Sequence, residues 1–100
     1  MPRIAIAMPH VLGQETAVAR VKQLLEKVKH KYQDQVSDLA ETWNDNVMDF
    51  QFKTYTFNIK GQLKVEPNQV ALDGDIPFAA LMFKGRIEQT LKDELTRLLA

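Results

Sequence analysis

The chain of 100 residues contains no cysteine, and this absence excludes several kinds of chemistry at once. Without thiols there is no disulfide framework, no thiolate zinc site and no cysteine nucleophile. A reducing cytosol is the simplest setting for such a chain, so we expect a cytoplasmic protein. Serine is almost absent as well, since Ser37 is the only one, and it lies outside any pattern typical of an activated hydroxyl nucleophile.

Long hydrophobic runs are also missing. The apolar stretch near the N-terminus covers five residues between two prolines, which is too short for the core of a signal peptide. No segment approaches the roughly 18–20 continuous apolar residues of a membrane span, so we expect no integral membrane segment. The four glycines are scattered along the chain, which argues against a glycine-rich loop that binds phosphate.

The chain has no excess of either charge, because 13 basic residues balance 13 acidic ones. A neutral total argues against nucleic acid as a partner, since binding to a phosphate backbone rests on several unopposed lysines and arginines. The charges are nevertheless unevenly placed, with basic residues gathered before residue 32 and acidic ones between residues 33 and 50. The basic cluster at residues 27–31 falls in the last turns of a predicted helix, where cations complement the helix dipole. We therefore interpret it as a solvated helix end.

The hydrophobic pattern predicts the order of helices and strands. Residues 3–8 alternate as in a strand, and the residues from Gln14 to about Tyr32 follow the helical period. Between Ser37 and Ile76 the period becomes two, with turn chemistry at residues 44–46 and 67–68. A last helix is expected to open at residues 75–77, with Pro77 in its first turn. The two apolar stripes are Ala17, Val21, Leu24, Leu25, Val28 and Tyr32, and Phe83, Ile87, Leu91, Leu95 and Leu98.

These elements predict one α+β domain over residues 1–100, in the order β-α-β-β-β-β-α. Each strand has a single apolar face, so a mostly antiparallel sheet is covered on one side by the two amphipathic helices in a two-layer sandwich. The other face of the sheet should be polar and meet water or a second copy of the chain. Its expected outward residues are Asn58, Lys60, Gln62, Lys64 and Asp73.

Two details of the strand region set specific expectations. Inward positions are even from Met48 to Phe52 and odd from Tyr55 to Val65, so a turn or a bulge must lie between Phe52 and Phe57. Gly61 falls among the inward positions, where a missing side chain predicts a bend or the close approach of a helix.

Few residues are candidates for chemistry. His10, in the loop before the first helix, is the better of two histidines for an acid–base role, although a histidine in such a place is more often a local hydrogen-bonding or packing residue. The run Asp73-Gly74-Asp75 resembles a fragment of a calcium loop but lacks the regularly spaced ligands and the terminal glutamate, so we interpret it as a strand end. We therefore predict no catalytic residue, no metal site and no cofactor.

One feature exceeds what a hydrophobic core requires. Residues 78–83 are apolar at six consecutive positions at the start of the predicted last helix. Consecutive residues point all around a helix, whereas a two-layer fold covers one side of it. We expect some of these side chains to face outward and to form an adhesion surface for a partner, unless a neighbouring element or a dimer mate covers them. The candidate binding residues are Phe78, Leu81, Met82 and Phe83.

Residues spread along the chain resemble, in their order, those of the polyhydroxyalkanoic acid system proteins. These are small bacterial proteins associated with genes of polyhydroxyalkanoate biosynthesis and utilisation, and some are found at granule surfaces. The resemblance implies a cytoplasmic accessory protein near polyester storage granules, and it transfers no catalytic residue. The residues that carry it are His10, Leu12, Gly13, Ala17, Arg20, Trp43, Gly61, Leu63, Val65, Val70, Leu72, Pro77, Lys84, Gly85, Ile87 and Glu88.

Three hypotheses for the function remain open. The favoured one is a non-enzymatic adaptor that binds a polyester granule surface, or a granule-associated protein, through the apolar run around Phe78. The second is a carrier of a small apolar ligand, for which the core of a 100-residue sandwich is expected to be too full, because ligand pockets usually have about 300 Å³ or more. The third is an enzyme that uses His10 with a nearby carboxylate. A homodimer is compatible with all three.

Overall fold

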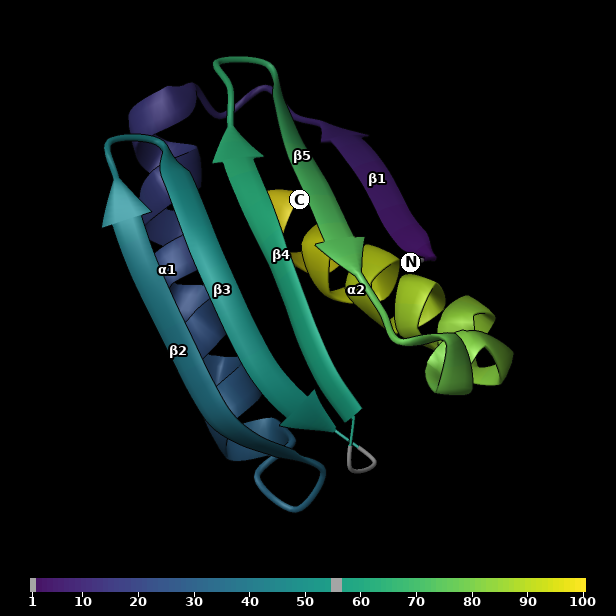
Figure 1. The fold of residues 1–100 in the computed structure, drawn as a ribbon. Helices are drawn as coiled ribbons and strands as arrows, with labels where there is room; N and C mark the ends of the chain where they lie inside the picture. Colours follow the sequence, from purple (N-terminus) through teal and green to yellow (C-terminus); the bar gives the residue numbers. More distant parts are fainter. Residues whose placement is uncertain (1, 55–56) are drawn as a thin grey trace.

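The computed structural model describes residues 2–54 and 57–100, and across them the chain forms a five-stranded sheet, two α-helices and one 3₁₀ helix (Figure 1). The predicted α+β class and the order β-α-β-β-β-β-α are confirmed. The elements are β1 (Arg3–Pro9), α1 (Gln14–Lys31), β2 (Val36–Asn44), β3 (Val47–Thr54), β4 (Phe57–Val65), β5 (Gln69–Asp75), η1 (Phe78–Phe83) and α2 (Lys84–Leu99).

The sheet has the order β1-β5-β4-β3-β2, and every neighbouring pair of strands is antiparallel. Strands β2 to β5 form a meander, and β1 joins its far edge beside β5. Helix α1 connects the two edge strands and lies behind β2 and β3, whereas α2 lies behind β4, β5 and β1 (Figure 1). The two helices therefore cover different halves of the same face of the sheet.

The core lies between this face and the helices. Helix α1 buries Ala17, Val21 and Leu25, which recur every four residues on one stripe, and α2 buries Leu95. The predicted polar outer face of the sheet is confirmed, because all five expected outward residues are exposed. The buried strand residues that the helices cover are Ile4, Ile6, Met48, Ile59, Leu63, Val65, Val70 and Leu72.

Pairing within the sheet explains the change of inward parity. Thr54 of β3 pairs with Phe57 of β4 in antiparallel register, so even positions on one strand face odd positions on the next, and the expected change of parity between Phe52 and Phe57 is confirmed. Tyr55, which we expected to point inward, lies outside the described residues. Gly61 pairs with Phe50, and a Cβ atom at Gly61 would meet the backbone carbonyl oxygen of Asp73 on β5 and lie 2.5 Å from Cζ of the Phe50 ring. Of the two alternatives expected for Gly61, a bend or the close approach of a helix, the helix is wrong, because the close neighbours belong to the two adjacent strands.

The last helix begins later than the sequence predicted. Asp75 ends β5 and Pro77 is extended, with ψ 152°, so residues 75–77 do not open the helix. A 3₁₀ helix follows, and α2 starts at Lys84. The run Asp73-Gly74-Asp75 lies within β5, as interpreted, and both of its carboxylates lie near Arg3 on β1, at 3.5 and 3.7 Å.

Candidate functional site

His10 lies where β1 meets the connection between β4 and β5. Its side chain is only 7% exposed. Nδ1 accepts a hydrogen bond from the backbone N–H of Leu12 at 3.2 Å, and Nε2 lies 2.9 Å from the carbonyl oxygen of Glu66. A carbonyl oxygen can only accept, so Nε2 is the donor in the second bond. Because both ring nitrogens bond to backbone groups, His10 acts as a structural clamp between the β1–α1 connection and Glu66.

Other side chains reinforce this end of the molecule. Val65 O accepts hydrogen bonds from Gln14 Nε2 at 3.0 Å and from Asn46 Nδ2 at 2.7 Å. The backbone N–H of Val65 in turn donates to Asn46 O at 2.8 Å. Together with His10, these bonds join the β1–α1, β2–β3 and β4–β5 connections, which we call the clamped end.

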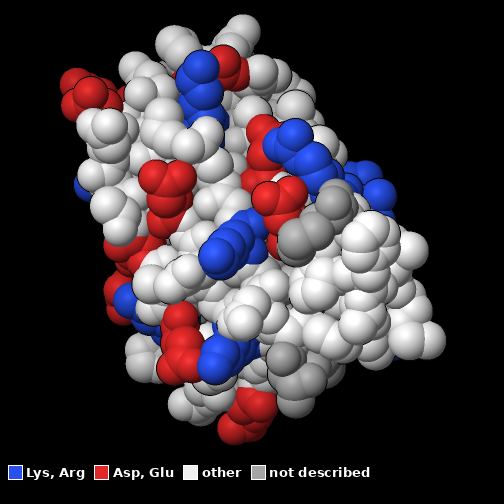
Figure 2. Space-filling model, in the orientation of Figure 1, with Lys and Arg blue, Asp and Glu red and all other residues white. Residues whose placement is uncertain are grey.

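The predicted apolar run lies at the opposite end, on η1. Phe78, Leu81 and Met82 are 72, 48 and 83% exposed, so the predicted exposure of these side chains is confirmed, while their role in binding stays a prediction. Figure 2 shows mixed basic and acidic side chains across the outer face of the sheet, whereas the surface over η1 carries neither. We call these three residues the η1 patch.

The geometry of the 3₁₀ helix explains which residues remain outside. With three residues per turn, Phe78 and Leu81 lie on the same side. Ala80 is fully buried, and the centroid of the Phe83 ring lies 6.2 Å from the centroid of the Phe57 ring on β4. Phe83 is half-buried in this contact, so the structure separates it from the other candidate binding residues.

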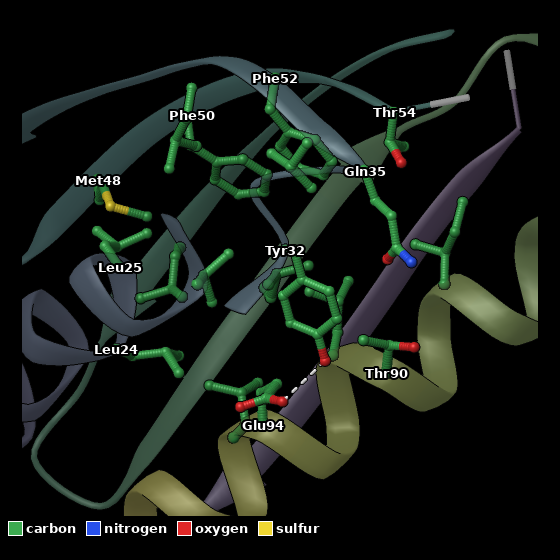
Figure 3. Close-up of a pocket in the computed structure, with 18 of the residues that line it drawn as sticks. Leu24, Leu25, Tyr32, Gln35, Met48, Phe50, Phe52, Thr54, Thr90 and Glu94 are labelled. Carbon is green, nitrogen blue, oxygen red and sulfur yellow. Dashed lines mark hydrogen bonds between the residues drawn. The ribbon is translucent and has the colours of Figure 1, made fainter. Parts of the chain in front are cut away.

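A partly open cavity of about 180 Å³ lies between α1, α2 and the inner face of the sheet (Figure 3). The volume is below the about 300 Å³ of usual ligand pockets, so the expectation that the core has no room for a pocket of that size is not contradicted, although a smaller space is present. The cavity arises because the two helices cover different halves of the sheet. Its wall is mostly apolar and includes Leu24, Leu25, Met48, Phe50, Phe52 and Leu91.

An anionic side chain at the edge of this cavity is already neutralised. Glu94 of α2 is 12% exposed, and its Oε1 accepts hydrogen bonds from Lys31 Nζ at 2.8 Å and from the Tyr32 hydroxyl at 3.0 Å. The Lys31 hydrogen bond is the main cause that lowers the pKa of the Glu94 carboxyl below its ordinary value of 4.5. The same bond raises the pKa of Lys31 above its ordinary value of 10.5. This cluster ties the end of α1 to α2.

Three other polar side chains line the cavity without such partners. Within residues 2–54 and 57–100, the side chains of Arg86, Thr90 and Gln35 make no hydrogen bond or ion pair with the protein. Figure 3 draws Thr90 of α2 and Gln35 among the side chains that line the cavity, together with Tyr32. Arg86 precedes Thr90 by one helical turn and so lies on the same side of α2.

Sequence reasoning missed this cavity because it treated each helix as a complete apolar stripe. A signal was present on α2, where Arg86, Thr90 and Glu94 recur every four residues beside the stripe. A polar row next to a stripe is also typical of an ordinary helix border, so the pattern alone does not reveal a cavity. Whether a cavity forms depends on the separation between the two helices. That separation is set by the packing of the whole sandwich, which the pattern of one helix does not specify.

Comparison with known proteins completes the description of these sites. Among the described residues, no helix is long and apolar enough to cross a membrane. No curated protein matches the chain. The family model described as "Putative polyhydroxyalkanoic acid system protein" matches residues 4–99, nearly the whole chain. The chain therefore belongs to the polyhydroxyalkanoic acid system family.

Proposed function

We propose that this protein is a non-enzymatic accessory protein that attaches reversibly to the surface of polyester storage granules through the η1 patch. One observation carries the proposal, which is that Phe78 and Met82 expose most of their surface at neighbouring turns of one short helix. Membership of the polyhydroxyalkanoic acid system family supports a granule as the target. Such an attachment places the protein in the cytoplasm, at the boundary between water and polymer.

The size of the patch fits a peripheral attachment. Complete burial of a large apolar side chain contributes about 1.5–3 kcal/mol, so three such side chains give several kcal/mol before the cost of immobilising the protein. This is enough for a measurable partition onto an apolar surface but not for permanent insertion. The neighbouring side chain of Lys84 is paired with Glu88 at 3.8 Å, so the proposal rests on apolar contact and not on attraction between charges.

A partition assay with polymer granules tests the proposal. Phe78→Ser combined with Met82→Ser removes the two most exposed side chains of the patch, and we expect the fraction bound to fall at least tenfold. Val11→Ser is the matched control, because Val11 is 99% exposed at the clamped end and undergoes the same kind of change. Binding of the control should equal that of the unmodified protein. Equal loss in both variants would reject the η1 patch as the attachment site.

The same assay separates the polymer from a protein on the granule. Granules washed free of their proteins should still bind the unmodified chain if the polymer surface is the target. Binding to native granules alone would instead show a granule-associated protein as the partner and overturn attachment to the polymer.

A further inference from the structure

We propose that the cavity between α1 and α2 binds a single-chain carboxylic acid of about six to eight carbons, with its chain inside and its carboxylate at Arg86. This inference goes beyond attachment through the η1 patch and does not depend on it. The η1 patch is an exposed surface, whereas the proposed ligand site is a partly open space between the helices and the sheet, lined mostly by apolar side chains.

The interior of the cavity fits a hydrocarbon chain. Its wall consists of aliphatic and aromatic side chains from both helices and from β3, and buried Met48 forms part of it. An apolar cavity of about 150 Å³ in another protein accommodates benzene, which has six carbons. A cavity of about 180 Å³ therefore has room for a short alkyl chain but not for a long fatty acyl chain or a sterol.

The polar side chains that line the cavity fit a carboxylate. Arg86 is a permanent cation with donors arranged in a planar fork that matches a carboxylate. Thr90, one turn along α2, and Gln35, just before β2, line the same cavity and supply further donors that have no protein partner within residues 2–54 and 57–100. Three donors around an apolar space favour an amphipathic anion over a neutral hydrocarbon.

The charges around the opening do not oppose such an anion. Glu94 is held by Lys31 and Tyr32, and Arg97 also lies 3.3 Å from it. Glu88, two residues after Arg86, faces Lys84 at 3.8 Å. Glu88 and Glu94 thus each lie close to another cation, and Asp93 accepts a hydrogen bond from Gln89 at 2.9 Å, so none of the three is paired with Arg86.

The site also lies at the same end of the molecule as the η1 patch. Helix η1 leads directly into α2, and Arg86 follows Phe83 by three residues.

Titration of the full chain with octanoate, followed by NMR of ¹³C-labelled methionine methyl groups, tests the proposal. Met48 lines the cavity and Met82 lies on the η1 patch, so the two methyl signals distinguish the two locations. We expect the Met48 signal to shift and saturate while that of Met82 stays in place. A shift of Met82 alone, or no shift at all at millimolar octanoate, would overturn the proposal.

Ligand series then test the two parts of the site separately. Each buried methylene contributes about fourfold in affinity, which is about 0.8 kcal/mol, so butanoate should bind more than 100-fold more weakly than octanoate. Octan-1-ol, which keeps the chain and lacks the carboxylate, should bind about tenfold more weakly. Arg86→Gln should reduce octanoate affinity to that of octan-1-ol and leave octan-1-ol unaffected. Equal binding of octanoate to the protein and to Arg86→Gln would reject the role of Arg86.

Two further variants test where octanoate binds and separate this binding from attachment to granules. Val28→Trp places an indole in the cavity and should abolish the shift of Met48, with folding checked by circular dichroism. Retained binding in a folded Val28→Trp protein would show that the ligand lies elsewhere. Phe78→Ser with Met82→Ser should bind octanoate normally, so loss of granule binding and loss of octanoate binding remain separate results.

Discussion

The two ends of this sandwich differ in how their side chains are used. At the clamped end, three chain connections meet, and the side chains of His10, Gln14 and Asn46 each bond to the backbone of another connection. At the other end, α1 and α2 separate around a cavity and η1 exposes three large apolar side chains. The comparison indicates that one end holds the fold together and the other is available for contacts with other molecules.

This division between the two ends suits a small domain. A chain of 100 residues has a limited core, so the stability lost in a loosely packed region must be supplied by interactions elsewhere in the chain. Partly buried backbone groups at the clamped end gain hydrogen-bond partners from side chains distant in sequence, which joins the three connections where the strands end there. The open end can then keep exposed apolar surface without loss of the overall arrangement.

The largest expected effect comes from His10→Ala. The substitution leaves the partly buried N–H of Leu12 and carbonyl of Glu66 without their side-chain partner, and the loss of each such hydrogen bond costs about 1–1.5 kcal/mol. We expect the free energy of unfolding, measured by urea titration, to fall by about 2–3 kcal/mol.

His10→Asn tests the same two hydrogen bonds. The asparagine amide can replace at most one of them, so we expect this variant to recover part of the lost free energy of unfolding. Val11→Ser at the neighbouring exposed position should change stability by less than about 0.5 kcal/mol. A change of that small size in His10→Ala would show that the clamp does not stabilise the fold.

An intermediate effect is expected from Glu94→Gln, which acts on the link between the helices at the open end. Its partners Lys31 and Arg97 are half or more exposed, so the ion pairs are screened and the loss near pH 7 should be about 1 kcal/mol. Folding lowers the pKa of Glu94, so its contribution is complete above its ordinary value of 4.5 and disappears as the pH falls through the lower folded value.

The pH dependence of unfolding checks this assignment. The difference in stability between the protein and Glu94→Gln should be constant from pH 6 to 8 and shrink toward pH 3. Tyr32→Phe is the control, because it removes a hydrogen bond to Glu94 and leaves the charge in place. A difference that grows as the pH falls would contradict a lowered pKa.

The sequence predicted the order of elements because each strand and helix carries its own period, which local positions determine. It also predicted the exposure of Phe78 and Met82, since six consecutive apolar residues cannot all be covered from one side. It placed the start of the last helix too early, because Pro77 is compatible with either a first helical turn or an extended approach.

The sequence pattern did not predict features that depend on several helices or strands at once. The ring of Phe50 over Gly61 follows from the register of β3 against β4, which periodicity does not specify. The hydrogen bond of His10 to Glu66 joins residues 56 positions apart. The cavity depends on where the two helices lie across the sheet, so Arg86 and Thr90 looked like ordinary border residues.

The smallest expected effect on stability comes from the η1 patch itself. Phe78→Ser with Met82→Ser should change the free energy of unfolding by less than about 0.5 kcal/mol, because both side chains are largely solvated in the folded state. Ala80→Leu in the same 3₁₀ helix should cost about 1–3 kcal/mol, since Ala80 is fully buried and a larger side chain has no room there. If the double variant were as destabilised as Ala80→Leu in urea, the patch would be packing that supports η1. A nearly unchanged midpoint would instead mean that these apolar side chains contribute little to folding, and that their exposure has to be explained by a contact outside the chain.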